Sequence, residues 1–472
     1  MSTHPHWVRR LLMIGSVPAL LLGVLAASAG TATPTPMPLN PMKLPWPRAN
    51  EILARVQPPK FPMRTFSVVQ FGAIGNGRSD CTAAFHKAVK ACWAAGGGSV
   101  MVPPGVYRTG AIKLLSHVDL HIQKGATIDF SGNPRQYPLE RCRNQGIDLM
   151  TFSPLIYAYD QTNIAITGHG ILNAARTGRW NHEVGRNWGL LQKMEREGVP
   201  VKDRVFGMGR PLATTFIEPY HCTNVLIKDI TLVHSHWWQL HPTLCTDVTI
   251  NHVTTEGTKA HSDGCDPDSC DNVVINNCFF GAGDDCIAIK SGRNADKFRS
   301  SRPCENLVIM NSRFSGPWGM IACGSEQTQG IKHVFGYNLR TVPWRKYRGV
   351  RYALYIKSNT MRGGYTRDVH VDHIRGTFSN AVVFATLNYG HSRDGHKPLF
   401  DDISLDHVTT ISAPRVLDLI GLPDDDIKSI TLRNCTFKHI THRNIVRNVK
   451  TLIMQNVKVN GQSMDHTVRG QR

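Results

Sequence analysis

The most regular feature of the sequence is a short alternation of apolar and polar residues that returns many times along the chain. Each copy begins with a polar residue and continues with apolar residues at every second position; copies start at Asn163, Asn224, Asp247, Asn272, Asn306, Asp368, Asp402 and Ser429. The starts at residues 224, 247, 272 and 306 are 23, 25 and 34 residues apart, within the range of solenoid repeats. A unit this short cannot close a core alone, so we expect each one to stack on its neighbours.

A second series of short segments lies between these copies, as expected for another face of each coil. They are Trp238–His241, Asp263–Asp266, Asp285–Ile289, Gly319–Cys323 and Leu354–Lys357. Short strands at this period, separated by turn residues, predict an all-β chain folded as a parallel β-helix rather than a helical or leucine-rich solenoid. Adjacent strands in such a stack are about 4.8 Å apart, so residues one coil apart in sequence become neighbours in space.

Only one segment has convincing helical spacing. It extends from Asp80 to Ala95 and ends at Gly96-Gly97-Gly98. We expect this helix, together with the segment from Ala91 to Thr109, to cap the N-terminal end of the stack. Residues 30–62 are dense in proline, which predicts an extended linker or an N-terminal wrap without regular structure.

The N-terminus has the pattern of a signal peptide. Arg9 and Arg10 precede an apolar stretch from Leu11 to Ala27, and Ala27-Ser28-Ala29 is the small-x-small motif that precedes cleavage. The stretch is shorter than the roughly 20 apolar residues of a membrane-spanning helix. We therefore expect export to the periplasm or the medium, with no membrane association after cleavage. The predicted divisions are residues 1–29 (signal peptide), 30–62 (linker) and 63–472 (β-helix domain).

The charge of the chain bears on its partner. With 54 Lys and Arg against 35 Asp and Glu, the formal net charge is +19, which favours polyanions: nucleic acid, lipid headgroups or an acidic polysaccharide. Export favours the polysaccharide over nucleic acid, although the basic residues are scattered and a generally basic surface would also explain them. Several of the twelve cysteines lie in apolar strand patterns. We expect most of them to be small buried hydrophobic residues, with one or two disulfides possible and no zinc site.

Three carboxylates are predicted to share one patch of the surface. Asp263 precedes Asp284 by 21 residues (284 − 263), close to one coil, and so should lie beside Asp284 and Asp285. Like-charge repulsion raises the pKa of at least one member of such a cluster. Glycoside hydrolysis requires such a protonated acid next to an ionised carboxylate. Given Asp266 and Asp268 nearby, a calcium site or turn-capping aspartates would also fit the spacing.

The surrounding motifs closely resemble the active-site motifs of glycoside hydrolase family 28, the polygalacturonases. The resemblance lies in Ser262-Asp-Gly-Cys-Asp-Pro-Asp and Gly283-Asp-Asp-Cys-Ile-Ala-Ile-Lys-Ser-Gly292, and it extends through Phe71-Gly-Ala-Ile-Gly, Ser153-Pro-Leu-Ile-Tyr and Trp238-Gln-Leu-His-Pro. It implies a right-handed parallel β-helix that hydrolyses with inversion and needs no cofactor or metal. It also implies that Asp284 is the general acid, that Asp263 and Asp285 activate water, and that Lys357 binds substrate.

Three positions depart from the family pattern. The chain has His261-Ser262-Asp263 for Asn-Thr-Asp, Pro317-Trp318-Gly319 for Gly-His-Gly, and Tyr355-Ile356-Lys357 for Arg-Ile-Lys. A motif histidine and a carboxylate-binding arginine are thereby lost. Trp318 and Tyr355 would offer aromatic surfaces for a sugar instead. Further candidates for the substrate site are His241, His261, Glu218 and Arg293.

We therefore expect an exo-acting glycosidase for an acidic plant cell-wall polysaccharide or its oligosaccharides, pectin above all. A β-helix pectic lyase, which would need calcium and a cationic base, is the alternative enzyme. A non-catalytic carbohydrate-binding β-helix is the third possibility. An exo enzyme needs a wall that closes its cleft at one end, and the segment from Asn173 to Arg210 is the candidate for that wall.

Overall fold

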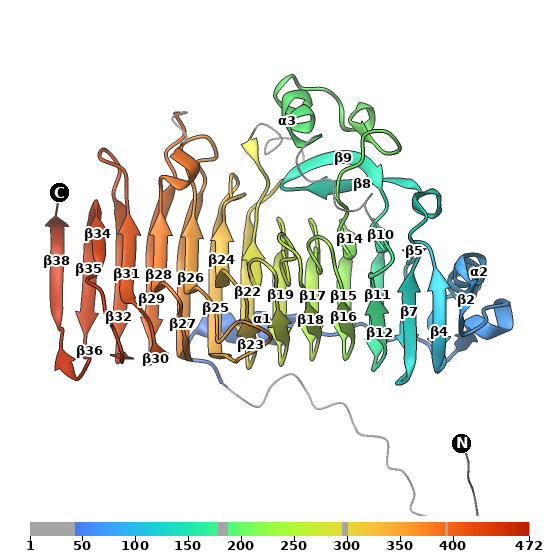
Figure 1. Ribbon diagram of the computed structural model, residues 1–472, viewed down its shortest axis with the longest axis horizontal. Coiled ribbons are helices and arrows are strands. Elements are labelled where there is room, and N and C mark those ends of the chain that lie inside the picture. The colour runs from blue at the N-terminus through green and yellow to red at the C-terminus, as the bar shows by residue number, and fades with distance from the viewer. Residues whose placement is uncertain (1–42, 178–186, 295–300, 392–394, 472) are drawn as a thin grey trace, which may run out of the picture. The chain divides into compact units, whose positions relative to one another are not determined.

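The computed structural model describes residues 43–177, 187–294, 301–391 and 395–471, and these form a parallel β-helix (Figure 1). One strand series of the long sheet has the bounds β1 (Thr65–Ser67), β3 (Gly98–Val102), β6 (Val118–Ile122), β11 (Thr162–Gly168), β15 (Thr223–Lys228), β17 (Thr246–Asn251), β19 (Asp271–Asn276), β22 (Cys304–Met310), β25 (Ile331–Thr341), β27 (Tyr365–Thr377), β29 (Leu399–Asp406), β32 (Ile427–Arg433) and β35 (Val449–Gln455). Each strand pairs in parallel with the next, so the predicted fold class is confirmed.

A second series in the same sheet forms another face of each coil. It comprises β2 (Asn76–Asp80), β4 (Gly105–Thr109), β7 (Ala126–Phe130), β12 (Ile171–Asn173), β16 (Thr231–Val233), β18 (Thr254–Glu256), β20 (Phe279–Gly281), β23 (Arg313–Ser315), β30 (Thr409–Ser412), β33 (Thr436–Phe437) and β36 (Lys458–Val459). At the C-terminal end, β37 (Gln462–Ser463) and β38 (His466–Gln471) pair antiparallel with the last coils.

The third face carries the candidate site. Its strands are β5 (Ile112–Lys113), β10 (Ile156–Tyr159), β14 (Ile217–Tyr220), β21 (Ile287–Ile289), β24 (Gly319–Gly324), β26 (Tyr352–Lys357), β28 (Ala381–Thr386), β31 (Arg415–Ile420) and β34 (Ile445–Arg447). Between β14 and β21 the pairing is reduced to single bridges at Leu240 and Cys265. The coils that carry the carboxylates are therefore the least regular of this face.

The polar residue that opens each repeat has a conformational reason. Asn163, Asn224 and Asn272 have φ values of 52°, 57° and 58°, in the left-handed region that Asn and Asp tolerate better than most residues. Their side chains also form a ladder, since Asn224 Nδ2 donates to Asn163 Oδ1 at 2.7 Å. The alternating residues that follow stack inward, as in the pairing of Val225 with Val248.

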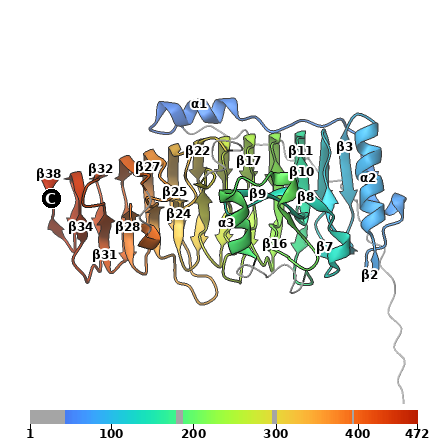
Figure 2. The ribbon, with the colours of Figure 1, turned by 90° about the horizontal axis from the view of Figure 1, so that it is seen from above.

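Three features differ from the sequence-based expectations. Helix α2 (Thr82–Ala94) covers the N-terminal end as expected, but residues 30–62 are not devoid of regular structure, because α1 spans Pro47–Arg55. Proline is accepted at the first position of a helix. The buried face of α1, which includes Ile52 and Leu53, packs on the outward-facing Val274 and Val308, and Figure 2 shows α1 lying across the strands near β22. The proposed boundary at residue 63 therefore excludes a helix that packs on the β-helix, and residues 1–29 lie outside the described ones.

The second difference is an outer layer over the third face. The antiparallel strands β8 (Leu139–Asn144) and β9 (Ile147–Phe152) form a small sheet with β13 (Val205–Phe206). A third helix, α3 (Trp188–Arg196), lies in the same layer (Figure 1). Sequence analysis had singled out the segment around α3 but not the hairpin of β8 and β9.

The third difference concerns the cysteines. All twelve lie in described residues, and each is free and buried, so the one or two disulfides considered possible do not form. Sγ of Cys245 and of Cys270 donate to backbone carbonyls at 3.1 Å, which is the behaviour of a small buried hydrophobic residue with a weak donor. No helix among the described residues has the length and apolar character to cross a membrane.

Candidate active site

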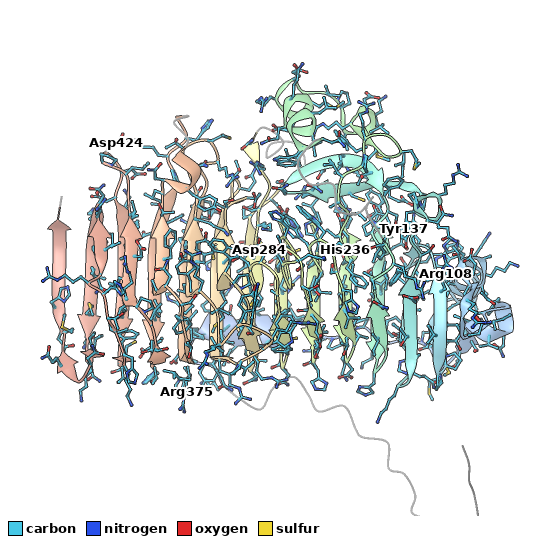
Figure 3. The ribbon with its side chains drawn as sticks, viewed as in Figure 1. Arg108, Tyr137, His236, Asp284, Arg375 and Asp424 are labelled. Carbon is cyan, nitrogen blue, oxygen red and sulfur yellow. The ribbon has the colours of Figure 1, made fainter. Side chains whose placement is uncertain are left out.

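The three predicted carboxylates come together on the third face. Asp285 precedes β21, and the backbone N–H of Gly264, next to Asp263, donates to the Asp285 carbonyl one coil away at 3.0 Å. One side-chain oxygen from each of Asp263, Asp284 and Asp285 lies within 4.8 Å of the others. Figure 3 labels Asp284 among the side chains of the β-helix. Stacking of coils thus produces the patch that the 21-residue spacing predicted.

The environments of the three carboxylates differ. Asp284 is the most accessible, with 23% of its side chain exposed against 6% for Asp263 and 2% for Asp285. Burial and the charge of Asp285 raise the pKa of Asp284. Burial, with the charges of Asp266 and Asp284, raises the pKa of Asp263 well above its usual range. The cluster can therefore hold a proton that isolated aspartates would have lost.

Asp285 makes the contacts of a carboxylate anion. Its Oδ2 accepts from Lys357 Nζ at 2.7 Å and its Oδ1 accepts from the Gly319 backbone N–H at 2.8 Å. Lys357 is buried, and although burial alone would lower its pKa, Asp285 raises it. A charge-assisted hydrogen bond of this kind is short and strong. Asp285 is thereby distinguished from Asp284, which lies beside His261 instead.

A second lysine, absent from the sequence-based candidates, joins the cluster to a buried polar layer. Lys290 Nζ lies 3.9 Å from Asp263 Oδ2, 3.4 Å from Asp266 Oδ1 and 3.5 Å from Glu326 Oε2. It also lies 4.3 Å from the ring centroid of Trp238. Burial raises the pKa of Asp266 to about 7, with Lys290 opposing the increase. Lys290 lies in the motif Ile289-Lys290-Ser291, close in sequence to Asp284 and Asp285, and this position could have identified it as a site residue.

The carboxylates line a pocket of about 340 Å³. Trp318 and Tyr355, the two departures from the family pattern, both line it, and their rings stack with centroids 6.0 Å apart. Lys357 Nζ lies 3.9 Å from the centroid of Tyr355. Only 4% of Tyr355 is exposed. The ring therefore packs against aromatic neighbours, and only a small part of its surface faces the pocket.

The two candidate histidines occupy different places. His261 lines the pocket, and its Nδ1 lies 3.7 Å from Asp284 Oδ2. His261 thus contacts the most accessible of the three carboxylates, whereas the position of the family histidine is occupied by Trp318. His261 has a φ of 64°, so the coil turns sharply just before Ser262 and Asp263.

His241 and Glu218 do not line the pocket, and the expectation that they bind substrate is wrong. His241 is fully buried, with Nδ1 3.8 Å from Glu218 Oε2 and Nε2 3.9 Å from Asp268 Oδ2. Although burial opposes it, Glu218 raises the pKa of His241 to about 9. Glu218 itself accepts from the Arg143 backbone N–H at 2.9 Å. Both residues belong to a polar layer beneath Trp238. The coil that carries His241 pairs only through isolated bridges, so alternation along the sequence did not show which of its side chains point outward.

Arg293 lies in the pocket lining and takes part in a buried ion cluster. Its Nη1 lies 3.2 Å from Glu326 Oε1, and Arg362 Nη2 lies 3.6 Å from the same oxygen. Burial raises the pKa of Glu326, but Lys290 and the two arginines outweigh it and lower the pKa to about 2. The guanidinium of Arg293 also lies 5.0 Å from the ring centroid of Trp188. Glu326 and Arg362 were not among the sequence-based candidates.

The outer layer closes the pocket at this side. Gln145, at the tip of the hairpin formed by β8 and β9, is one of the pocket residues. A Cβ on Gly146 would lie 2.8 Å from Arg293 Cβ, so the hairpin tip rests directly on this turn. The expected wall is thus built from the hairpin as well as from Trp188 at the start of α3.

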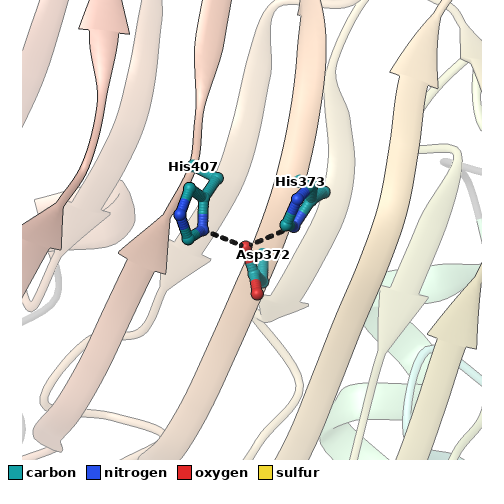
Figure 4. Close-up of side chains that lie close together, drawn as sticks. All are labelled: Asp372, His373 and His407. Atoms are coloured by element: carbon teal, nitrogen blue, oxygen red, sulfur yellow. Dashed lines mark hydrogen bonds and ion pairs between the residues drawn. The ribbon is translucent and has the colours of Figure 1, made fainter. Parts of the chain in front are cut away.

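Three groups of carboxylates and histidines have ligand atoms within 4.8 Å of one another among the described residues. In the catalytic group, lysine ammonium groups contact Asp285 and Asp263, whereas calcium needs oxygen ligands on most sides. In a second group, shown in Figure 4, Asp372 Oδ1 accepts from His373 Nδ1 at 2.7 Å and His407 Nδ1 at 2.9 Å. The third consists of Asp368, His370 and Asp402. The last two groups lie outside the pocket.

One distance differs from expectation. Inverting glycosidases usually separate their two carboxyl groups by roughly 6.5–9.5 Å, yet the nearest oxygens here lie within 4.8 Å. The close approach follows from the fold, because adjacent coils bring Asp263 against Asp284 and Asp285 on one face. Whether the reaction inverts or retains the anomeric configuration therefore has to be measured.

Comparisons with known proteins agree with the fold. The family model described as Glycosyl hydrolases family 28 matches residues 208–451. The chain is similar to the crystal structure of a hyperthermoactive exopolygalacturonase from Thermotoga maritima, with 31% identity and a TM-score of 0.84 over 90% of this chain and 98% of that chain.

Two further comparisons are more distant. A Vitis vinifera protein named "Probable polygalacturonase" is 28% identical over 386 residues, which cover 78% of this chain and 73% of that protein. A family 28 exopolygalacturonase of Yersinia enterocolitica has a TM-score of 0.66 at 21% identity, over 84% of this chain and 78% of that chain. The second likeness concerns the fold alone.

Proposed function

Because the chain belongs to glycosyl hydrolases family 28, we propose that it hydrolyses galacturonan by acid–base catalysis at Asp263, Asp284 and Asp285. The observation that carries this proposal is the arrangement of three carboxylates and Lys357 in one pocket. Such a site can protonate a glycosidic oxygen, activate water and offset the charge of a uronate.

The roles follow from the environments. Asp284 combines a raised pKa with the greatest exposure, so it donates the proton to the leaving oxygen. Asp285, which accepts a hydrogen bond from Lys357 Nζ, takes the proton of the attacking water, and Asp263, whose pKa is raised well above its usual range, holds that water by a hydrogen bond. Water rather than a carboxylate attacks the sugar, so the anomeric configuration inverts. The first-formed anomer, followed by ¹H NMR, tests this directly, and retention would contradict it.

We also propose that the enzyme acts from a chain end. The wall formed by the hairpin of β8 and β9 and by Trp188 lies at the Arg293 side of the pocket, where it would obstruct a polymer that extended past Arg293. The similarity to the exopolygalacturonase of Thermotoga maritima supports the same mode.

The test is product analysis with polygalacturonate. Chromatography should show short products from the first minutes, with reducing ends rising and no absorbance from unsaturated sugars. Unsaturated products would identify a lyase, and the absence of both signals would leave a carbohydrate-binding protein. Mid-length oligomers appearing first would contradict exo action. Asp284→Asn, assayed in parallel, controls for contaminating enzymes.

Export is a separate proposal. It rests on Arg9, Arg10 and the apolar stretch that follows them, and on the Ala27-Ser28-Ala29 motif. A polymeric cell-wall substrate would be met outside the cytoplasm. N-terminal sequencing of the protein recovered from periplasm or medium should begin at Gly30, and recovery of the intact Met1 terminus would contradict cleavage.

A further inference from the structure

A second hollow lies beside the catalytic pocket and has no part in the chemistry described above. Its volume is about 780 Å³, within the range of ~300–1,000 Å³ common for ligand sites. The hollow is formed by the turns that occupy equivalent positions in five successive coils. These turns contribute residues 316–317, 346–351, 377–380, 412–414, and 439 and 441. These turns lead into β24, β26, β28, β31 and β34, so the hollow is a groove that follows the stack.

The groove has the chemistry of a site for an acidic sugar chain. Its lining includes Lys346, Arg348 and Arg351 and contains no Asp or Glu. Lys346 and Arg348 are exposed, and within the part of the chain that the structure describes neither forms an ion pair with a carboxylate. Tyr347 adds an aromatic ring, 5.3 Å from Lys346 Nζ. The neighbouring Arg345 differs, because it pairs with Glu256 at 3.3 Å and lies outside the lining.

The groove begins where the catalytic pocket ends. The guanidinium of Arg351 lies 4.5 Å from the ring centroid of Trp318, and the Arg351 backbone N–H donates to the Trp318 carbonyl at 2.8 Å. Trp318 in turn lines the pocket and stacks on Tyr355. The indole of Trp318 therefore lines the catalytic pocket and contacts Arg351, which lines the groove.

The direction of the parallel strands gives the two spaces an order. Trp318 lies just before β24, whereas Arg293, beneath the wall, lies just after β21. Because the strands are parallel, these are opposite ends of the third face, and Asp284 and Asp285, just before β21, lie at the same end as Trp318. A sugar chain whose end abuts the wall at the Arg293 end therefore reaches the carboxylates and the Trp318 end as it extends across the face.

We propose that this groove binds the remainder of the galacturonan chain beyond the bond being cleaved, through its regularly spaced carboxylates. The proposal rests on the proposed function of the catalytic pocket. The groove supplies Lys346, Arg348 and Arg351 from one turn, and the substrate supplies one carboxylate per unsubstituted sugar. Long chains gain contacts that a disaccharide cannot reach, so the groove favours polymer over short oligomers.

The experiment compares Arg348→Gln with Arg345→Gln in the full-length enzyme. Both remove one positive charge from the same loop, but only Arg348 lines the groove. KM and kcat are measured with polygalacturonate and with digalacturonate. For Arg348→Gln we expect the KM for polygalacturonate to rise about two- to fivefold, as for one exposed ion pair, with digalacturonate kinetics unchanged. Lys346→Gln/Arg348→Gln should enlarge the effect, and raised salt should diminish it.

Each other outcome has a defined meaning. An unchanged KM for polygalacturonate in the double variant would overturn the proposal that the groove binds the sugar chain. A change of the same size in Arg345→Gln would overturn it as well. Equal losses on digalacturonate and polymer would also overturn it, because the charges would then act on the catalytic pocket. Unaltered melting temperatures exclude misfolding as the cause. If the wild-type enzyme cleaves neither substrate, the proposed function itself fails, and that result is distinct from a groove without effect.

Discussion

Asp284 is the carboxylate that reaches furthest into the pocket, and Asp285 is the one that Lys357 holds. Replacing either by Asn removes a proton donor or acceptor while keeping the shape of the side chain. We expect Asp284→Asn and Asp285→Asn each to lower kcat by at least about 10²-fold, the size of a general acid–base contribution. Circular dichroism should match the wild type, and near-normal turnover in either variant would place the catalytic centre elsewhere.

His261 offers a test through pH. A general acid works only while protonated, so activity should fall as pH rises through the pKa of Asp284. A protonated His261, 3.7 Å from Asp284, favours the carboxylate and lowers that pKa. In His261→Gln the pKa of Asp284 should therefore be higher, and the alkaline limb of the kcat/KM profile should move to higher pH. A shift in the opposite direction, or none, would remove His261 from the acid–base centre.

Tyr355 bears on which sugar occupies the neighbouring subsite. Tyrosine can stack and donate one hydrogen bond, but it cannot offset a carboxylate charge as arginine does. We expect Tyr355→Arg to improve kcat/KM on unsubstituted galacturonate oligomers relative to methyl-esterified ones, which lack the carboxylate charge, by about 1–3 kcal/mol in transition-state binding. Tyr355→Ala should damage both, because its ring supports Trp318. Kinetics on both substrates measure the ratio, and an unchanged ratio in Tyr355→Arg would mean that this edge does not face substrate.

At this scale the sequence predicted the carboxylates, Lys357 and Trp318 because their motifs are contiguous. Glu326 and Arg362 escaped because their roles depend on a buried cluster assembled from several coils. Glu218 was misplaced for a related reason. Its strand β14 alternates, but the hairpin of β8 and β9 covers the outer side of Glu218, because the Arg143 backbone N–H donates to Glu218 Oε1 at 2.9 Å. Alternation identifies the two sides of a strand, but it does not show whether the outer side meets solvent.

At the scale of elements, the repeats were predictable and the outer packing was not. Asn272-Val273-Val274-Ile275 was read as an alternation, yet Val274 is also apolar and faces outward beneath α1. Consecutive apolar residues of this kind are typical of a strand buried on both faces. The same signal recurs at Val308, so the sequence did contain a sign that something covers these strands. The proline density of residues 30–62 obscured which segment it was.

Helix α1 should contribute measurably to stability. Ile52 is 2% exposed and packs among the apolar residues between α1 and the strands. We expect Ile52→Ala to lower the free energy of unfolding by about 2–4 kcal/mol, the usual cost of such a truncation in a core. Denaturant unfolding measures this change, and Glu51→Ala, on the exposed side of the same helix, is the control. Equal stabilities of the two variants would show that α1 is docked only loosely.

At the scale of the whole molecule, the wall determines where the enzyme can cut. Replacing residues 187–203 with a short Gly-Ser linker would remove Trp188 from Arg293 while leaving the carboxylates and Arg204 in place. The pocket should then open, and early products from polygalacturonate should shift from short sugars to mixed oligomers. Chromatography of the first products gives the answer. Unchanged release of short products would mean that the hairpin of β8 and β9 closes the pocket alone.

The position of α1 also has a consequence for the timing of synthesis. Arg48 Nε donates to Asn306 Oδ1 at 3.1 Å, across 258 residues of sequence. At a translation rate of ~5–20 residues per second, roughly 10–50 s separate the appearance of the two partners. Until β25 has left the ribosome, the apolar face of α1 lacks part of the surface that covers it. Proteolysis of nascent chains stalled before and after Thr341 should show α1 becoming fully protected only in the longer chains. The first helix of this chain thus reaches its place only after the strands up to β25 have been made.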